Sequence, residues 1–414
     1  MIPNSTGNET NIKLPFSFIL FGLVAFIASQ SILLFNGSSI ITGSFRIPPI
    51  WSAAHLFILG WAVMTAMGAM YQLVPVAFLT PIWSEKFGFV QFFITAIGVL
   101  WFAHALFHEP QTALIPAAVA IIGILMFLIQ MFMTLRKQAT PNVLTLFVGT
   151  GLVCFLLTII LGITLVLSWQ TGILGNYYHA IFKSHLLLGT TGWFTLLIFG
   201  FSYKMVPMFS LSHGFTMKLA IWVYVTYLFG LLLMIIAFFM NKEALITVGI
   251  LFLMVGFSLF AFHIVQILKK RVKKKLDRPF LFALFAIVCG LVIHVVAAIA
   301  GIFGHFGQFV APLLFSYIYF WIAFSIIGYL YKIVPFLWWT HKYSKEIGKR
   351  EVPVLKDMMN ERLALPLFIS FVVGTTIVVI AIAIKNAIVF NLGQSIFCLA
   401  VVIFSATTAL VMKK

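Results

Sequence analysis

Three stretches of this chain share one pattern: GAMYQLVP at 68–75, GFSYKMVP at 200–207 and GYLYKIVP at 328–335. Each stretch reads Gly-x-x-Tyr-x-x-Val-Pro. A dipeptide that ends in Trp, Gly-Trp in the first two copies and Phe-Trp in the third, begins eight residues before the first Gly of each stretch. The copies lie about 130 residues apart, so they form an internal repeat much longer than that of a solenoid protein.

The composition around these repeats is that of a membrane protein. Hydrophobic residues make up 63% of the chain and charged residues 8%, and the mean hydropathy is +1.14. No soluble globular domain approaches these values. Stretches long enough to cross a bilayer, about 20 apolar residues each, lie near 15–36, 50–79, 87–108, 111–135, 143–168, 178–209, 217–240, 244–268, 280–303, 308–338, 363–384 and 387–411. We predict an all-α polytopic membrane protein with twelve transmembrane helices in a single membrane domain over residues 1–414.

The repeats fall on the second, sixth and tenth of these helices. A spacing of four helices divides the chain into three pseudo-threefold arcs of four helices each, with repeat units that end near Pro75, Pro207 and Pro335. These helices run from outside to inside in our topology. Each Tyr-x-x-Val-Pro is therefore expected at an inner helix end, where Pro is tolerated.

The distribution of positive charge fixes the expected orientation. With both termini placed in the cytoplasm, all 26 Lys and Arg fall on the inner side except Arg46, Lys183, Lys242 and Lys385, as the positive-inside rule requires. We therefore predict a multi-pass protein of the cell's inner membrane. The net charge of +17 is mainly a topology signal, and we expect contacts with membrane lipid and none with nucleic acid. Binding of anionic lipid or an acidic partner by the basic run 269–278 is the second interpretation.

Histidines are the candidate cofactor ligands. A neutral imidazole inside a membrane needs partners and readily binds heme iron or copper. His55, near the start of helix two, and His185, two turns into helix six, are expected at similar depth on helices related by the repeat. His294 and His305 fall in the same outer half. A backbone carbonyl as the only partner is the alternative for each of them.

A second histidine pattern suggests a metal site. His104 and His108 are four residues apart with Glu109 adjacent, and this spacing places both imidazoles on one helix face, where they could hold a divalent ion. Water at the helix end would satisfy the pair equally well. None of the nine acidic residues falls in the middle of a predicted span. This argues against a carboxylate-based proton pump, although Tyr, Ser, Thr and water chains could still conduct protons.

The pattern as a whole resembles the catalytic subunit of the heme-copper oxidase superfamily, and most of all its nitric oxide reductase branch. That family has twelve helices in three arcs and carries its ligands on helices two, six and ten. His55 followed by 68–75 is similar to the family's helix that supplies a low-spin heme ligand. The resemblance implies about one heme b, with His55 as an axial ligand and His185, His294 or His305 as candidates for the second position.

Other family ligands have no counterpart. The family places two histidines on helix ten, but 309–338 contains none, and its adjacent histidine pair is missing from 217–244. Gly189 replaces the family's Tyr four residues after the helix-six His. The resemblance therefore implies no complete binuclear centre and makes copper or another second metal doubtful.

Three functions follow as hypotheses. The first is a heme-binding membrane protein in electron transfer, nitric oxide response or heme handling, supplied with electrons by quinol or another respiratory subunit. The second is a cofactor-free transporter, channel or respiratory-complex assembly factor on the same fold, because a fold alone does not define a function. The third is a divergent nitric oxide or oxygen reductase. Enzymatic activity and a homo-oligomeric state are left open.

Overall fold

The computed structural model describes residues 10–138 and 140–414, and these residues form helices without any β-strand. Twelve of the helical segments are long and apolar enough to cross a membrane. The predicted number of spans is thus confirmed. The chain is an all-α, multi-pass membrane protein.

Nine spans are built around one uninterrupted α-helix. They are α1 (Lys13–Asn36), α4 (Glu85–His108), α5 (Leu114–Leu135), α6 (Val143–Thr171), α9 (Lys218–Met240), α10 (Glu243–Lys269), α11 (Arg278–Ile302), α14 (Glu361–Ile384) and α15 (Ala387–Leu410).

The other three spans are the repeat helices, and each is interrupted by a π-helical segment. The composite spans are α2 (Pro48–His55), η2 (Leu56–Val63) and α3 (Met64–Phe78); α7 (Tyr178–Leu187), η5 (Leu188–Thr195) and α8 (Leu196–Ser210); and α12 (Phe306–Ser316), η6 (Tyr317–Ala323) and α13 (Phe324–Tyr343).

The π segments occupy equivalent positions in the repeat. Each ends five residues before the motif glycine, at Val63, Thr195 and Ala323. Each also contains the motif tryptophan, whose side chain is fully buried in all three copies. A π-helical turn is uncommon and is found most often at functional sites. The sequence repeat is therefore a repeat of backbone geometry as well.

The motif proline lies within the last turns of its helix in two of the three copies. Helices α3 and α8 each end three residues after their Pro. The next residue is a left-handed C-cap, Leu79 for α3 and Leu211 for α8, and its N–H donates to the carbonyl of that Pro. Helix α13 continues past Pro335 to Tyr343. The expected helix end is wrong for this third copy. Trp339 within this extension anchors it to the following loop, because its indole N–H donates to the carbonyl of Pro353 at 2.6 Å.

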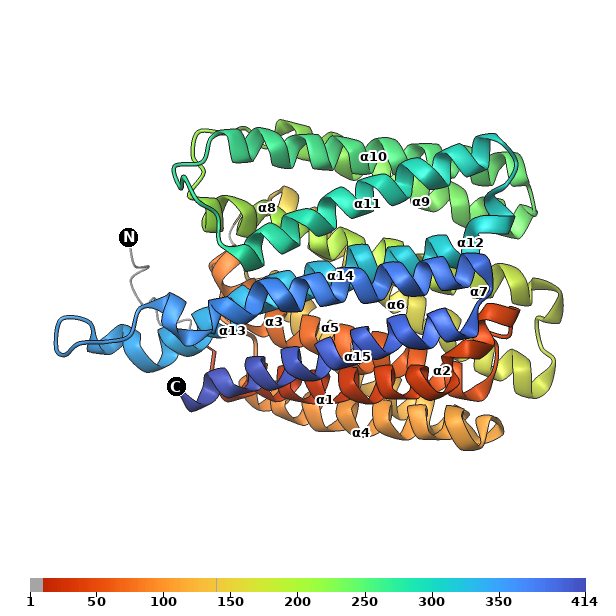
Figure 1. Cartoon of the computed structure of the whole chain (residues 1–414), viewed down its shortest axis with the longest axis horizontal. Helices are drawn as coiled ribbons and strands as arrows, with labels where there is room; N and C mark the ends of the chain where they lie inside the picture. Colours follow the sequence, from red (N-terminus) through yellow and green to blue (C-terminus); the bar gives the residue numbers. More distant parts are fainter. Residues whose placement is uncertain (1–9, 139) are drawn as a thin grey trace. The chain divides into compact units, whose positions relative to one another are not determined.

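The chain folds as two compact units. Unit 1 comprises the residues up to Gln138 together with Ile326–Lys414, and unit 2 the residues between them. In unit 1, α14 packs along α15, and α1 packs against α15 and η2. In unit 2, α9 packs along α10, α10 packs against α11, and α11 packs against η6 (Figure 1). The order of packing is thus the same in both units. A hairpin of two helices packs against a single helix, and that helix packs against the π segment of a composite span.

Glycines allow these hairpins to pack closely. A Cβ atom at Gly230 of α9 would lie 2.9 Å from the carbonyl oxygen of Gly249 in α10, and one at Gly374 of α14 would lie 3.0 Å from that of Gly393 in α15. Small residues at such crossings let membrane helices approach each other and gain dispersion contacts. The two hairpins therefore use the same packing solution.

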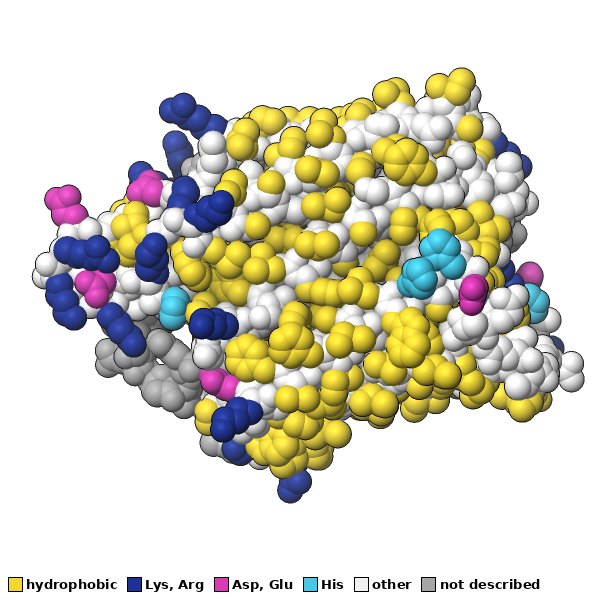
Figure 2. Space-filling model, turned by 90° about the horizontal axis from the view of Figure 1, so that it is seen from below, with side chains coloured by type: hydrophobic (Ala, Val, Ile, Leu, Met, Phe, Trp, Pro, Cys, Tyr) yellow, Lys and Arg dark blue, Asp and Glu magenta, His cyan; other side chains and the backbone are white. Residues whose placement is uncertain are grey.

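The sides of the helices are apolar. Figure 2 shows hydrophobic side chains over the face that it draws, with Lys and Arg side chains towards the helix ends. Large apolar side chains such as Phe35 and Ile388 are more than 80% exposed. Such a surface is stable only against lipid, which agrees with a protein that spans the bilayer.

Candidate functional site

His55 is the last residue of α2 and directly precedes the first π segment. Its ring is half-buried and lies edge-on against Phe102, with centroids 5.0 Å apart. Nδ1 lies 2.8 Å from the carbonyl oxygen of Trp51, an acceptor only, so this contact requires the proton on Nδ1. Nε2 then carries a lone pair, and no group in the described part of the chain hydrogen-bonds to it. A histidine that ligates a metal is usually held in this way, with its other nitrogen on a carbonyl.

The helix that follows His55 buries polar atoms without partners. Trp61 stacks on Phe26 at 3.8 Å and 11° and on Phe57 at 5.1 Å and 22°. Its indole nitrogen and the hydroxyl of Thr65 are buried, and neither has a hydrogen-bond partner within the described chain. Buried polar groups are rarely left unpaired. These groups follow His55 on its composite helix, and the fit to a heme rests on His55 itself, whose Nε2 could take an axial position.

His185 faces its neighbouring helix. Its Nδ1 lies 2.9 Å from the carbonyl oxygen of Thr158 in α6. A Cβ atom at Gly162 would lie 3.1 Å from its Cε1 atom, so Gly162 provides room for the imidazole. Although His185 begins the second repeat as His55 begins the first, its ring packs against α6.

The remaining sequence-predicted histidines outside α11 are on the surface. His305 is the exposed N-cap residue of α12. His104 and His108 are exposed at the end of α4, with ring centroids 4.6 Å apart. Among the residues that the structure describes, no three side chains of His, Cys, Asp or Glu are grouped so that they could hold a metal ion. The metal role of the His104 and His108 pair stays a prediction.

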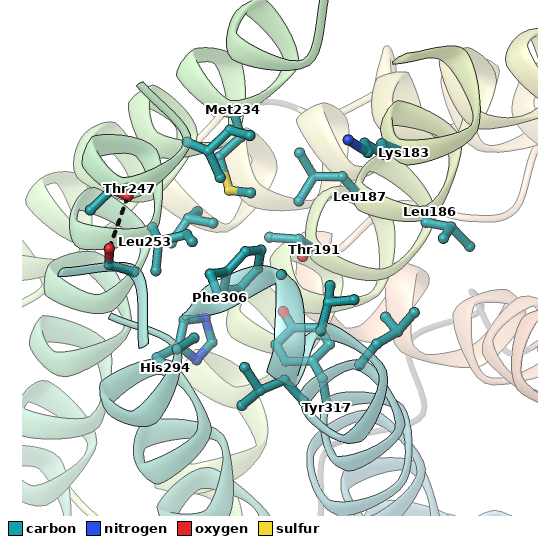
Figure 3. A pocket seen from close by; sticks show the side chains of 18 of the residues that line it. Lys183, Leu186, Leu187, Thr191, Met234, Thr247, Leu253, His294, Phe306 and Tyr317 are labelled. Atoms are coloured by element: carbon teal, nitrogen blue, oxygen red, sulfur yellow. Dashed lines mark hydrogen bonds between the residues drawn. The ribbon is translucent and has the colours of Figure 1, made fainter. Parts of the chain in front are cut away.

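Unit 2 contains a cavity of about 510 Å³. Its walls come from α7, η5, α9, α10, α11 and the α12 and η6 segments, and they are mainly apolar (Figure 3). The volume is within the range of about 300–1,000 Å³ that is typical of small-molecule sites. His294 is the only one of the four predicted cofactor ligands among the lining residues described for this cavity.

His294 is held in the same way as His55 but faces a different neighbour. Its side chain is 5% exposed, and its Nδ1 lies 2.7 Å from the carbonyl oxygen of Gly290, four residues earlier in α11. Its Nε2 lies 3.3 Å from the hydroxyl of Tyr227, which must donate because Nε2 carries the lone pair. This imidazole already has a partner on each nitrogen. It therefore fits an axial ligand less well than His55 does.

Within unit 2, His294 is the first member of a chain of hydrogen-bonded side chains. The hydroxyls of Tyr227 and Tyr317 lie 3.1 Å apart, and Tyr317 lies 2.6 Å from the hydroxyl of Thr195. The indole N–H of Trp321 donates to Thr195 at 3.0 Å. All of these side chains are buried. A fully paired network of this kind fixes side-chain positions in an apolar interior.

These hydroxyl-bearing residues were not among the site residues predicted from the sequence. Tyr317 begins η6, four residues before the motif Trp321, and Thr195 is two residues after the motif Trp193. A polar side chain this close to a repeated motif, inside an apolar span, is itself a functional signal. The positions of Tyr317 and Thr195 therefore carried a signal of function, although only histidines were predicted as site residues.

Comparison with known proteins gives a match in structure alone. No protein-family model matches the chain, and a search of curated proteins gives no match. Solved structures do match, among them a chain of a heme-copper terminal oxidase dimer determined by cryo-EM. It has a TM-score of 0.72 and 11% sequence identity, and the match covers 98% of this chain and 85% of that one. The predicted resemblance is confirmed at the level of the fold: the twelve helices are arranged as in a heme-copper oxidase.

Proposed function

We propose that this chain is a heme-binding membrane protein with the heme-copper oxidase fold and without a complete binuclear centre, and that His55 is an axial ligand of one heme b. The observation that carries the proposal is the geometry of His55, whose Nδ1 is fixed on the Trp51 carbonyl while Nε2 has no partner among the described residues. The fold likeness supports it, because the similar chain is part of a heme-copper terminal oxidase.

The role that we propose is electron transfer, nitric oxide response or heme handling, with quinol or another respiratory subunit as the electron donor. Heme supplies one-electron chemistry when bound. The chain itself supplies the axial imidazole of His55. The buried aromatic stack around Trp61 excludes water from this part of unit 1. The second axial ligand stays a prediction from the sequence.

The test is the visible spectrum of the purified protein, oxidised and reduced with dithionite, together with the heme content from the pyridine hemochrome. We expect about one heme per chain and a sharp reduced α band, because a heme b with two nitrogen ligands is low-spin when reduced. His55→Ala should lose this band.

His104→Ala is the matched control, because it removes an exposed imidazole from the same unit and should keep the heme. A wild-type protein made with ample heme that contains none would overturn the proposal and favour the cofactor-free alternative. An unchanged spectrum in His55→Ala would overturn the assignment of the ligand.

A further inference from the structure

The cavity in unit 2 has one buried polar end within apolar walls. His294, Tyr317 and Thr191 line it with exposed fractions of 5%, 8% and 6%. The rings of His294 and Tyr317 lie 5.5 Å apart, and Figure 3 shows both side chains on the same side of the cavity as α11 and η6. The Tyr317 proton is used on the Tyr227 oxygen, but the hydroxyl oxygens of Tyr317 and Thr191 can accept a hydrogen bond. This end can therefore bind a ligand group that donates one, such as a hydroxyl.

The walls favour an uncharged aromatic ligand. Leu187, Leu253 and Leu313 supply aliphatic surface, and Phe306 and Met234 supply a ring and a thioether. Thioether sulfur makes favourable contacts with aromatic rings, worth about 0.3–1.5 kcal/mol in general. A buried charge would need a partner of opposite sign, and the described residues at the buried end carry no formal charge.

The charged residues of the cavity are at its exposed rim. Lys183 and Glu243 both line it, both are exposed, and they are opposite in sign. Lys183 lies over the ring of Phe238, with Nζ 5.7 Å from the centroid. Because the two charges oppose each other, the rim selects neither an anion nor a cation. Net charge is therefore not the basis of recognition.

We propose that this cavity binds an uncharged phenol, with its hydroxyl at Thr191 and Tyr317 and its ring and alkyl substituent against the apolar walls. The hydroxyl of such a ligand joins the polar chain that runs from His294 through Tyr227 and Tyr317 to Thr195. This inference does not rest on heme binding, since His55 belongs to unit 1 and the cavity to unit 2.

The experiment is calorimetric titration of the full chain in lipid nanodiscs with 4-hexylphenol. The ligand control is 4-hexylanisole, which has a similar shape and lipophilicity but a methyl ether in place of the O–H donor. We expect saturable binding of the phenol that is about tenfold tighter than that of the ether, the worth of one well-made hydrogen bond. Equal binding of the two, or only unsaturable partition into lipid, would overturn the proposal.

Two variants locate the site. Leu187→Trp fills the cavity from its half-buried wall and should abolish saturable binding. Thr191→Val keeps the shape and removes one hydroxyl, and it should weaken phenol binding about tenfold without changing the affinity for the ether. Leu232→Trp is the matched control, because Leu232 is an exposed side chain of α9 outside the cavity. Wild-type affinity for the phenol in both cavity variants would place any binding elsewhere and contradict the proposal. The heme content of each variant is read separately and should not change.

Discussion

His55 and His294 make the same hydrogen bond at Nδ1 but have different neighbours at Nε2. In each, Nδ1 bonds to the backbone carbonyl four residues earlier in its own helix, that of Trp51 at 2.8 Å and that of Gly290 at 2.7 Å. The half-buried His55 has no partner for Nε2 in the described chain, whereas the buried His294 accepts from Tyr227 at 3.3 Å. The local helix sets the tautomer in both cases. The neighbouring helices then decide whether the second nitrogen is available to a cofactor or is part of a polar network.

The largest expected effect on stability comes from Gly290, which supplies the carbonyl that holds His294. A Cβ atom here would lie 2.4 Å from Cζ of Phe257, whose ring centroid is 4.3 Å from that of His294. We expect Gly290→Ala to cost about 1–3 kcal/mol, as overpacking does, and to lower the unfolding temperature in nanodiscs.

Gly149→Ala in α6 is the matched control for this change. Nothing lies within 4 Å of its added Cβ, and Ala is a better helix former than Gly. It should leave the unfolding temperature unchanged or raise it. The same loss in both variants would show that tight packing beside His294 is not the cause.

The hydroxyl of Tyr227 is the hydrogen-bond donor that His294 has at Nε2 and that His55 lacks in the described chain. Tyr227→Phe leaves Nε2 of His294 buried without a donor and takes a partner from Tyr317. We expect a loss of about 1–2 kcal/mol, because each unpaired buried group carries its desolvation cost.

Tyr224→Phe on the same helix removes a single bond, 2.7 Å to Thr150, from a partly buried site. Hydrogen bonds between membrane helices average about 0.6 kcal/mol, so this control should lose less. Comparing the free energies of unfolding in mild detergent with SDS measures the difference. If Tyr224→Phe is the more costly change, the chain from His294 to Thr195 is not a cooperative network.

The smallest expected difference in the free energy of unfolding is between two of the motif tryptophans, Trp321 and Trp61. The indole N–H of Trp321 donates to Thr195, whereas that of Trp61 is buried with no partner in the described chain. Replacement of either by Phe removes similar ring volume, so Trp321→Phe should be more destabilising by about 0.6 kcal/mol, one interhelical hydrogen bond. Equal free energies of unfolding would contradict this.

Most of the fold could be predicted from the sequence because the signals are periodic. Apolar stretches about as long as a bilayer is thick define the twelve spans, and the spacing of 68–75, 200–207 and 328–335 relates three of them. The π segments at the same positions could not be predicted. They change which backbone groups hydrogen-bond to each other, and their side chains differ between the three copies, so the hydrophobic pattern carries little trace of them.

The candidate site was predicted only in part. Sequence position gave His55 and His185 similar depth, but the direction of a ring depends on which helix packs beside it, and His185 bonds to Thr158 of α6. The polar chain joins Thr195, Tyr227 and Tyr317 from three helices that are far apart in sequence. Such a meeting is decided by tertiary packing, which no local spacing encodes.

The contrast between the two histidines is tested most directly by replacing each with glycine and adding imidazole. We expect purified His55→Gly to lack the reduced α band and to regain it when heme and imidazole are supplied together, because free imidazole can take the axial position. His294→Gly should hold about one heme without added imidazole. Wild-type heme content in His55→Gly before imidazole is added, or loss of heme in His294→Gly alone, would contradict the assignment of His55 as the ligand.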